Sequence, residues 1–278
     1  MTNRPHKLII LVMKNQYNLF YNKLAAVYTE EDYVYSTVSG ILRRRFINTV
    51  ISRMPKGNLV EIGCGGMPVE WERGLAVYID IAKDTLKRAM LRINSDNSFF
   101  ISGDAQNLHF LKPVFDIAVM SETIEHLVNP RKAIEEIYKI LKPSGIIFIT
   151  CPNWTYKRPV YQKHQIIDSL GIEYPESDGY IHTAYKPFEL TQICNEAGFE
   201  IINSGSFEKE LRYWTKIPLI LRKLFETLFG QKEWIDKFYN GSLNLGYLIL
   251  SIFRIPKLMN KVVRNGRRTF VIGIKPDE

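Results

Sequence analysis

The stretch Leu59-Val60-Glu61-Ile62-Gly63-Cys64-Gly65-Gly66-Met67 decides the fold that this sequence predicts. Its first half is a short, mostly apolar run typical of a buried strand. Three glycines follow at once, and glycine both tolerates positive φ and lets a ligand approach bare backbone. The stretch therefore predicts a strand that ends in a ligand-binding loop.

Short apolar runs alternate with amphipathic stretches on both sides of this loop, which is typical of strands separated by helices. Continuous apolar strands suit a parallel sheet that is covered on both faces. The sequence therefore predicts an α/β fold, a doubly wound Rossmann-like sheet of seven strands. These strands are expected at residues 58–63, 76–81, 98–102, 115–120, 145–150, 199–207 and 269–275.

Helix signals lie between and around these strands. Asn129 and Pro130 form a cap and a first-turn proline, and another helix begins at Pro187 and stops at Gly198. Before residue 58 an apolar stripe that includes Leu42 and Phe46 lies opposite residues 43–45, which are all arginine. We therefore expect four segments: an N-terminal helical cover at 1–57, a core at 58–207, a helical insertion at 208–267 and a final strand with a tail at 268–278.

Composition limits the class of protein. The 278 residues are 46% hydrophobic and 24% charged, which suits one large globular domain or a domain with an appendage. Cys64, Cys151 and Cys194 are far apart and form no CxxC pair, so a reducing, cytoplasmic setting is the simplest interpretation. The apolar run at 8–13 is too short to span a bilayer and no small-residue cleavage site follows it, so secretion is not expected.

The glycine loop does not fit a dinucleotide site. A GxGxxG fingerprint that starts at Gly63 needs glycine at position 68, where the sequence has Pro68. A nicotinamide or flavin dinucleotide is therefore not the expected ligand.

The loop resembles that of class I S-adenosylmethionine (SAM)-dependent methyltransferases, in particular the type 11 group, where an acidic residue precedes GxGxG. Glu61, Gly63 and Gly65 match, and Met67 stands where a third glycine is usual. The resemblance implies that Asp80 accepts hydrogen bonds from the ribose hydroxyls and that Asp104 reads the adenine amino group. The full set of SAM contacts it implies is Glu61, Gly63, Cys64, Gly65, Asp80, Ile81, Asp104, Ala105 and Ser121.

The charges of these residues suit that ligand independently. SAM carries a sulfonium and an ammonium but no phosphate, so carboxylates at Glu61, Asp80 and Asp104 fit it better than they fit an anionic dinucleotide. Taken singly, a glycine triplet is more often a tight turn and an aspartate at a strand end is more often a helix cap.

The segment after the fourth strand is Ser121-Glu122-Thr123-Ile124-Glu125-His126-Leu127, and Lys142-Pro143-Ser144-Gly145 opens the fifth. Both segments are similar to the quinone-biosynthesis O-methyltransferases, in which ExxEH, Asn-Pro and LKPxG occur in this order. An NPPY-type tetrapeptide is absent, and Cys151-Pro152 follows the wrong strand for a cytosine C5 nucleophile. O-methylation is therefore favoured over methylation of nucleic-acid bases.

Three interpretations of the ExxEH element stay open. In a helix, Glu122, Glu125 and His126 would share one face, which is the outline of a site for a hard cation such as Mg²⁺. The resemblance implies that His182 is a further ligand of this cation. Alternatively, His126 or His182 is a metal-free general base, the catalytic residue of the site. The third interpretation is that these side chains have only structural roles: they cap a helix or form hydrogen bonds to a loop.

The insertion is basic and apolar. Residues 205–278 hold 14 Lys and Arg against 7 Asp and Glu, which is most of the net charge of +8. An amphipathic helix is expected over 217–228, followed by an apolar run at 243–253 and a cationic stretch. This pattern predicts a helix that lies on an anionic membrane surface without crossing it. A lid, a subunit contact and, less favoured, a nucleic-acid surface are the alternatives.

These observations together predict a SAM-dependent O-methyltransferase. Its acceptor would be a small molecule, a lipid-linked molecule such as a prenyl quinone, or a saccharide on a lipid carrier. Its expected place is the cytoplasm, at the inner face of a membrane. A non-catalytic protein with the same fold and an RNA methyltransferase are the alternatives, and the sequence does not give the oligomeric state.

Overall fold

The computed structural model describes residues 8–10, 16–27, 37–93, 95–110, 112–154, 160–163, 165–210, 216–230 and 232–277. The chain forms two compact units. The first comprises Met1–Glu30, Arg53–Gly205 and Thr269–Glu278, and the second comprises Glu31–Ser52 and Ser206–Arg268. The four-segment division stays a prediction.

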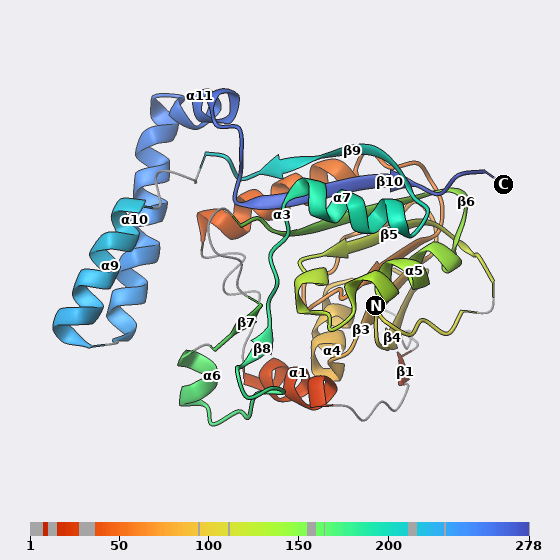
Figure 1. The fold of residues 1–278 in the computed structure, drawn as a ribbon, viewed down its shortest axis with the longest axis horizontal. Helices are drawn as coiled ribbons and strands as arrows, with labels where there is room; N and C mark the ends of the chain where they lie inside the picture. Colours follow the sequence, from red (N-terminus) through yellow and green to blue (C-terminus); the bar gives the residue numbers. More distant parts are fainter. Residues whose placement is uncertain are drawn as a thin grey trace. The chain divides into compact units, whose positions relative to one another are not determined.

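An eight-stranded sheet is the centre of the first unit, and its strands lie in the order β1-β4-β3-β2-β5-β6-β10-β9 (Figure 1). The strands are β1 Leu8–Ile10, β2 Leu59–Ile62, β3 Ala76–Asp80, β4 Ser98–Ser102, β5 Phe115–Ser121, β6 Leu141–Pro152, β9 Glu200–Phe207 and β10 Arg268–Ile274. All seven predicted strands are present, so the predicted fold class is confirmed. The eighth, β1, is an edge strand that pairs with β4.

The neighbouring strands from β1 to β6 are parallel. The last strand runs the other way, because the backbone N–H of Lys275, just past the end of β10, donates to Gly145 near the start of β6 at 2.8 Å. Parallel strands are buried on both faces, and β2 is apolar for that reason: Leu59, Val60 and Ile62 are completely buried. The strand order reverses between β2 and β5. In open α/β sheets, ligands bind at the carboxyl ends of the strands at such a reversal.

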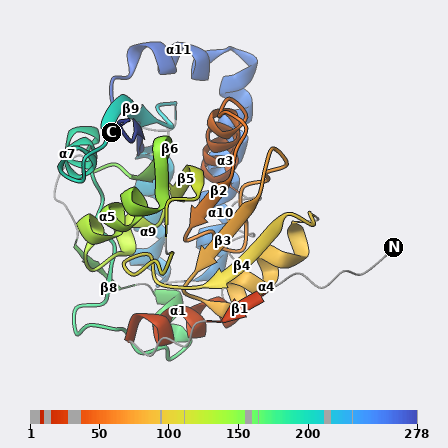
Figure 2. The same cartoon turned by 90° about the vertical axis from the view of Figure 1, so that its right-hand side faces the viewer.

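Helices cover both faces of the sheet in Figure 2, with α5 and α7 on one side and α4 on the other. The signals that predicted helix starts at Asn129 and Pro187 are confirmed, and the Asn129 side chain accepts from the Lys132 N–H at 3.1 Å. A separate hairpin of β7 Tyr161–Gln162 and β8 Tyr180–Ile181 lies outside the main sheet. The helices of this unit are α1 Gln16–Val27, α4 Lys83–Arg92, η1 Ile124–His126, α5 Pro130–Ile140, α6 Gln165–Ser169 and α7 Pro187–Glu196.

The second unit is helical and consists of α3 Val38–Ile51, α9 Lys216–Phe229, α10 Glu233–Ile252 and α11 Ile255–Val262. The α9 and α10 helices lie side by side. The α3 helix is fixed to the insertion, because the Ser39 hydroxyl donates to Glu208 at 2.9 Å and the rings of Phe46 and Phe207 stack at 4.1 Å.

Two features of this unit go beyond the sequence pattern. Arg43 lies opposite the apolar stripe of α3 but is buried. The α10 helix has 20 residues, longer than the apolar run that predicted it. Among the described residues, no helix combines the length and the apolar character that a membrane crossing needs.

Candidate functional site

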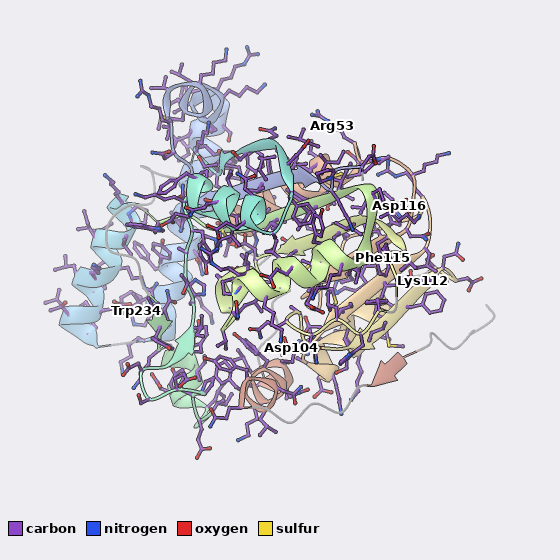
Figure 3. All side chains as sticks on the ribbon, turned by 45° about the vertical axis from the view of Figure 1, so that its right-hand side comes forward. Arg53, Asp104, Lys112, Phe115, Asp116 and Trp234 are labelled. Atoms are coloured by element: carbon purple, nitrogen blue, oxygen red, sulfur yellow. The ribbon has the colours of Figure 1, made fainter. Side chains whose placement is uncertain are left out.

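The predicted site residues gather at the carboxyl edge of the sheet, where four strands end next to one another. In order across the sheet these strands are β4, β3, β2 and β5. Figure 3 shows Asp104, which follows β4, close to α1, whereas Phe115 and Asp116 at the start of β5 lie away from it. The edge that carries Asp104 is thus the edge that α1 covers.

Asp80 ties the glycine loop to the end of β3. One carboxylate oxygen accepts the N–H of Gly65 at 2.9 Å and the other accepts the N–H of Ala82 at 2.8 Å. Gly63 and Gly65 have φ of 69° and 61°, the left-handed region that glycine adopts freely. The carboxylate is therefore held in a fixed orientation at the mouth of the loop.

Gly63 is needed for close packing at the point where the strand order reverses. A Cβ at this position would overlap the side chain of Thr123, whose hydroxyl donates to the Gly63 carbonyl at 3.1 Å. The Gly63 and Cys64 amides both donate to the Ile79 carbonyl. The loop thus bends sharply between β3 and the end of β5. This bend is possible because Gly63 has no side chain.

Glu61 and Asp104 are buried carboxylates that also shape the backbone near them. Glu61 accepts the N–H of Val69 at 2.8 Å and so folds the loop back on β2. Asp104 accepts the backbone N–H of Gln106 at 2.9 Å, as a capping residue does. With Asp80 they place a carboxylate on each of three neighbouring strands, a donor set that fits a cationic ligand.

The remaining predicted contacts also lie at this edge. Cys64 and Ala105 are buried, and the Ile81 carbonyl accepts from Asn18 of α1 at 2.9 Å. The Ser121 hydroxyl lies 3.1 Å from that of Thr150, a residue that the sequence did not single out. Every residue predicted to contact SAM is therefore on or directly after one of these strand ends.

Glu122–His126 do not form the helix on which the cation-site interpretation depends. Only Ile124–His126 form a turn, of the 3₁₀ type, and Glu122 precedes it with φ of 54°. The Glu122 carboxylate accepts from the Thr150 hydroxyl at 3.0 Å. A non-glycine residue in this backbone region stores strain, which is common at functional sites.

The structure does not bring the predicted metal ligands into one cluster. Within the described part of the chain, which includes Glu122, Glu125, His126 and His182, no group of three or more His, Cys, Asp or Glu is placed to hold a metal ion. The backbone turn at Glu122 explains this, because it breaks the helical spacing on which the prediction depended. The arrangement as it stands does not fit Mg²⁺.

His126 and His182 do come together, because β8 runs beside η1. The Thr183 N–H donates to the Glu125 carbonyl at 2.7 Å, and the two imidazole rings lie 5.0 Å apart. The Nδ1 of His126 is 3.1 Å from the Ile181 carbonyl, and its Nε2 is 4.0 Å from the buried carboxylate of Glu125. Since a carbonyl oxygen only accepts, Nδ1 carries the hydrogen, and the neutral ring has its lone pair on Nε2.

Aromatic residues of α1, a helix that the sequence did not connect with the site, surround these histidines. Phe20 stacks with Tyr180 at 5.5 Å, and Tyr21 meets His126 edge-on at 6.0 Å. The helix is fixed to the core because Asn22 accepts from the Lys83 N–H at 2.9 Å. No local pattern in the sequence connects α1 with the site, because the connection depends on contacts far apart in the chain.

The three cysteines are buried free thiols. Burial raises the pKa of Cys194 to about 12. A thiol with that pKa carries almost no thiolate at neutral pH, so Cys194 is not a nucleophile.

The sequence is similar to those of known methyltransferases. Residues 60–149 match the family model described as a methyltransferase domain. The ubiquinone biosynthesis O-methyltransferase of Glaesserella parasuis is 29% identical over 175 residues, which cover 57% of this chain and 72% of that protein. The protein of the same name from Leptothrix cholodnii is 24% identical over 189 residues, 62% of this chain and 78% of that one.

Solved structures share the fold. Phosphoethanolamine N-methyltransferase 2 of Haemonchus contortus, solved with phosphomonomethylethanolamine and S-adenosylhomocysteine, aligns over 96% of this chain and 61% of its own, with a TM-score of 0.54 and 16% identity. The [4+2]-cyclase SpnF aligns over 97% of this chain and 100% of its own, with a TM-score of 0.53 and 18% identity.

Proposed function

Because this chain is a class I SAM-dependent methyltransferase, we propose that it methylates a hydroxyl oxygen of a small or lipid-linked acceptor. The observation that carries the proposal is the contact of the His126 Nδ1 with the Ile181 carbonyl at 3.1 Å, which puts the lone pair of the neutral imidazole on Nε2. Support also comes from the relatives named ubiquinone biosynthesis O-methyltransferases. A hydroxyl on a flat ring suits the aromatic side chains next to His126.

The donor site consists of the carboxyl edge described above. SAM supplies a methyl group on a sulfonium, and the C–S bond breaks with its electron pair left on sulfur while the new O–C bond forms. Asp80 would accept hydrogen bonds from the ribose hydroxyls, and Asp104 would accept one from the adenine amino group. The negative charge of Glu61, next to the glycine loop, would balance the positive charge of SAM. Their placement on three neighbouring strands supports these roles.

His126 acts as the general base in this proposal. Its Nε2 takes the proton of the attacking hydroxyl, and the Ile181 carbonyl keeps the ring in the tautomer that can do so. The carboxylate of Glu125, 4.0 Å from Nε2, then stabilises the imidazolium that forms. His182 flanks the ring at 5.0 Å and would orient it.

The sequence also predicted a divalent cation as the alternative to a metal-free base. Because the structure does not gather Glu122, Glu125, His126 and His182 into a group that fits Mg²⁺, we expect methyl transfer to proceed without one. Methyl transfer measured after treatment with a chelator, and again after Mg²⁺ is returned, separates the two alternatives. Full activity in the chelator supports His126 as a metal-free base, and recovery only with Mg²⁺ supports the cation.

The insertion supports a lipid-linked acceptor. Exposed apolar side chains follow α9, α10 and α11, and Lys257 and Lys261 lie among those of α11. The exposed apolar residues are Leu219, Ile220, Leu224, Leu228, Phe229, Trp234, Phe238, Leu245, Leu248, Ile249, Ile252, Phe253, Leu258 and Val262. Apolar surface beside cations suits the inner face of an anionic membrane, where the protein would be peripheral. Tyr213 and Trp214, which could also stack on bases or headgroups, lie outside the described residues.

The experiment that tests the function is transfer of labelled methyl from SAM to cell extract, separated into lipid, polysaccharide and RNA fractions. Label in the lipid fraction is expected, and label only in RNA would contradict the proposal. His126→Gln should lower transfer at least a hundredfold, the low end of what a general base contributes. His109→Gln, at an exposed histidine outside the site, is the matched control.

A further inference from the structure

The hydroxyl of Tyr21 is a buried polar group that the mechanism above does not use. Its oxygen is inaccessible to water and has no hydrogen-bond partner among the described residues. Buried hydroxyl groups nearly always have a partner, since an unsatisfied one destabilises the fold. An exception of this kind at a ligand site points to a bond that forms only when the ligand is present.

The Tyr21 hydroxyl has charged neighbours from both halves of the site. The carboxylates of Glu125, on the acceptor side, and of Asp80, on the donor side, both interact with it electrostatically. Its ring meets that of His126 edge-on, with the ring centres 6.0 Å apart. The transferred methyl group has to pass between these same two halves.

Tyr21 stays protonated at neutral pH. Burial is the main cause that raises the pKa of this phenol well above its usual value, and electrostatic interactions with neighbours such as Tyr180 and Glu125 add to it. A protonated phenol next to His126 is a hydrogen-bond donor, whereas the Nε2 of neutral His126 is an acceptor. The two groups therefore offer complementary contacts to a single hydroxyl: one accepts its proton and the other donates to its oxygen.

We propose that Tyr21 is a substrate-contacting residue whose hydroxyl donates a hydrogen bond to the acceptor oxygen and aims its lone pair at the methyl group. The acceptor proton goes to Nε2 of His126, and the phenol keeps its own. This inference rests on the proposed function, because it assumes that the acceptor atom is an oxygen next to His126.

The α1 helix offers a matched control. Tyr17 lies one turn before Tyr21, and its hydroxyl donates to Glu176, an exposed residue, at 3.3 Å. Removing the Tyr17 hydroxyl takes away a bond that is visible in the protein. Removing the Tyr21 hydroxyl takes away none that is present among the described residues, so the two variants separate helix stability from ligand contact.

The test compares Tyr21→Phe with Tyr17→Phe in the full chain, using catechol as the acceptor probe. For Tyr21→Phe we expect the melting temperature to stay or rise and the Kd of S-adenosylhomocysteine to stay within twofold. With S-adenosylhomocysteine bound, we expect the Kd of catechol to rise at least tenfold by calorimetry, and kcat/KM for methyl transfer to fall as much. Tyr17→Phe should leave both Kd values unchanged.

The outcomes separate this inference from the function on which it rests. Catechol binding that is unchanged in Tyr21→Phe overturns the inference and leaves the function intact. A lower melting temperature, or a tenfold loss of S-adenosylhomocysteine affinity, also overturns it, since the hydroxyl would then support the fold or the donor. Catechol binding to wild type without any methyl transfer overturns the function, and the inference falls with it. Absence of catechol binding to wild type likewise overturns both.

Discussion

At the scale of single residues, the Asp80 carboxylate is positioned by two backbone amides. Asp80→Ala should therefore weaken S-adenosylhomocysteine binding by at least tenfold, about 1.4 kcal/mol, because the ribose contact and the anchor of the loop are both lost. Calorimetry measures this. Asp84→Ala, at an exposed aspartate paired with Lys87, is the control. Equal affinity of Asp80→Ala and wild type would remove Asp80 from the site.

Gly63→Ala, which adds a methyl group at this position, should destabilise the fold. Its Cβ overlaps the Thr123 side chain, and its φ of 69° is unfavourable for alanine. We expect Gly63→Ala to lower the free energy of unfolding by about 2–4 kcal/mol in urea titrations. Gly171→Ala, with a φ of 63° and nothing within 4 Å of the new Cβ, should cost only about 1 kcal/mol. Equal losses would show that the Thr123 contact is unimportant.

The sequence identified the donor-side residues but not Tyr21. Glu61, Gly63 and Asp80 are recognisable because each stands at a fixed distance from a strand end, which local sequence determines. Tyr21 reaches the site only because Asn18 and Asn22 bond to Ile81 and Lys83, more than 60 residues away. Tertiary contacts of that kind leave no periodic signal in the sequence.

At the scale of elements, the turn at Ile124–His126 shows how a spacing rule can fail. Glu122 and His126 have the spacing of residues on one face of an α-helix. Asn129, however, caps α5 only three residues after His126, so this segment is too short for an α-helix of its own. The bond from Thr150 to Glu122 then fixes the strained turn. Pairing between distant segments outweighed the local pattern here.

The end of α10 offers a test of membrane binding. Ile252 and Phe253 are 72% and 70% exposed, and Arg254 follows them. Replacing both with serine should lower sedimentation with anionic liposomes at least tenfold, since each large apolar side chain contributes about 1.5–3 kcal/mol when buried. Leu91→Ser, at an exposed leucine of α4, is the control. Equal sedimentation of the double variant and wild type would contradict membrane docking by this helix end.

At the scale of the whole molecule, buried tyrosines make the free energy of unfolding fall as the pH rises into the alkaline range. Burial is the main cause that raises the pKa of Tyr21 and Tyr78 far above the usual 10. Above pH 10 the unfolded chain loses these protons while the native state keeps them, so stability falls as pH rises, by about 1.4 kcal/mol per pH unit for each tyrosine. Urea midpoints at pH 8, 10 and 11 measure this loss.

A variant isolates the contribution of one tyrosine. Tyr21→Phe should reduce the loss above pH 10 without abolishing it, because Tyr78, Tyr17 and Tyr247, whose pKa values are also raised, still contribute. An identical decline in the variant and wild type would show that Tyr21 ionises equally easily in both states.

The strands and the fold class were the most predictable features of the molecule, because strongly apolar strands separated by amphipathic helices permit few arrangements. The grouping of α3 with the insertion was not predictable. It depends on contacts such as that of Ser39 with Glu208, far apart in sequence, and on burial of Arg43, a residue type that patterns assign to the surface.

The two ends of the insertion are fastened to each other. The Gly266 N–H donates to the Ser206 hydroxyl at 2.8 Å, and Arg268 lies 3.8 Å from the Glu208 carboxylate. The chain thus leaves β9 and enters β10 at one point, where the two ends of the insertion are bonded to each other. An insertion attached in this way can change in length or sequence during evolution without altering the strand order of the sheet. The surface that contacts a membrane or another partner can therefore change while the methyl-donor site stays the same.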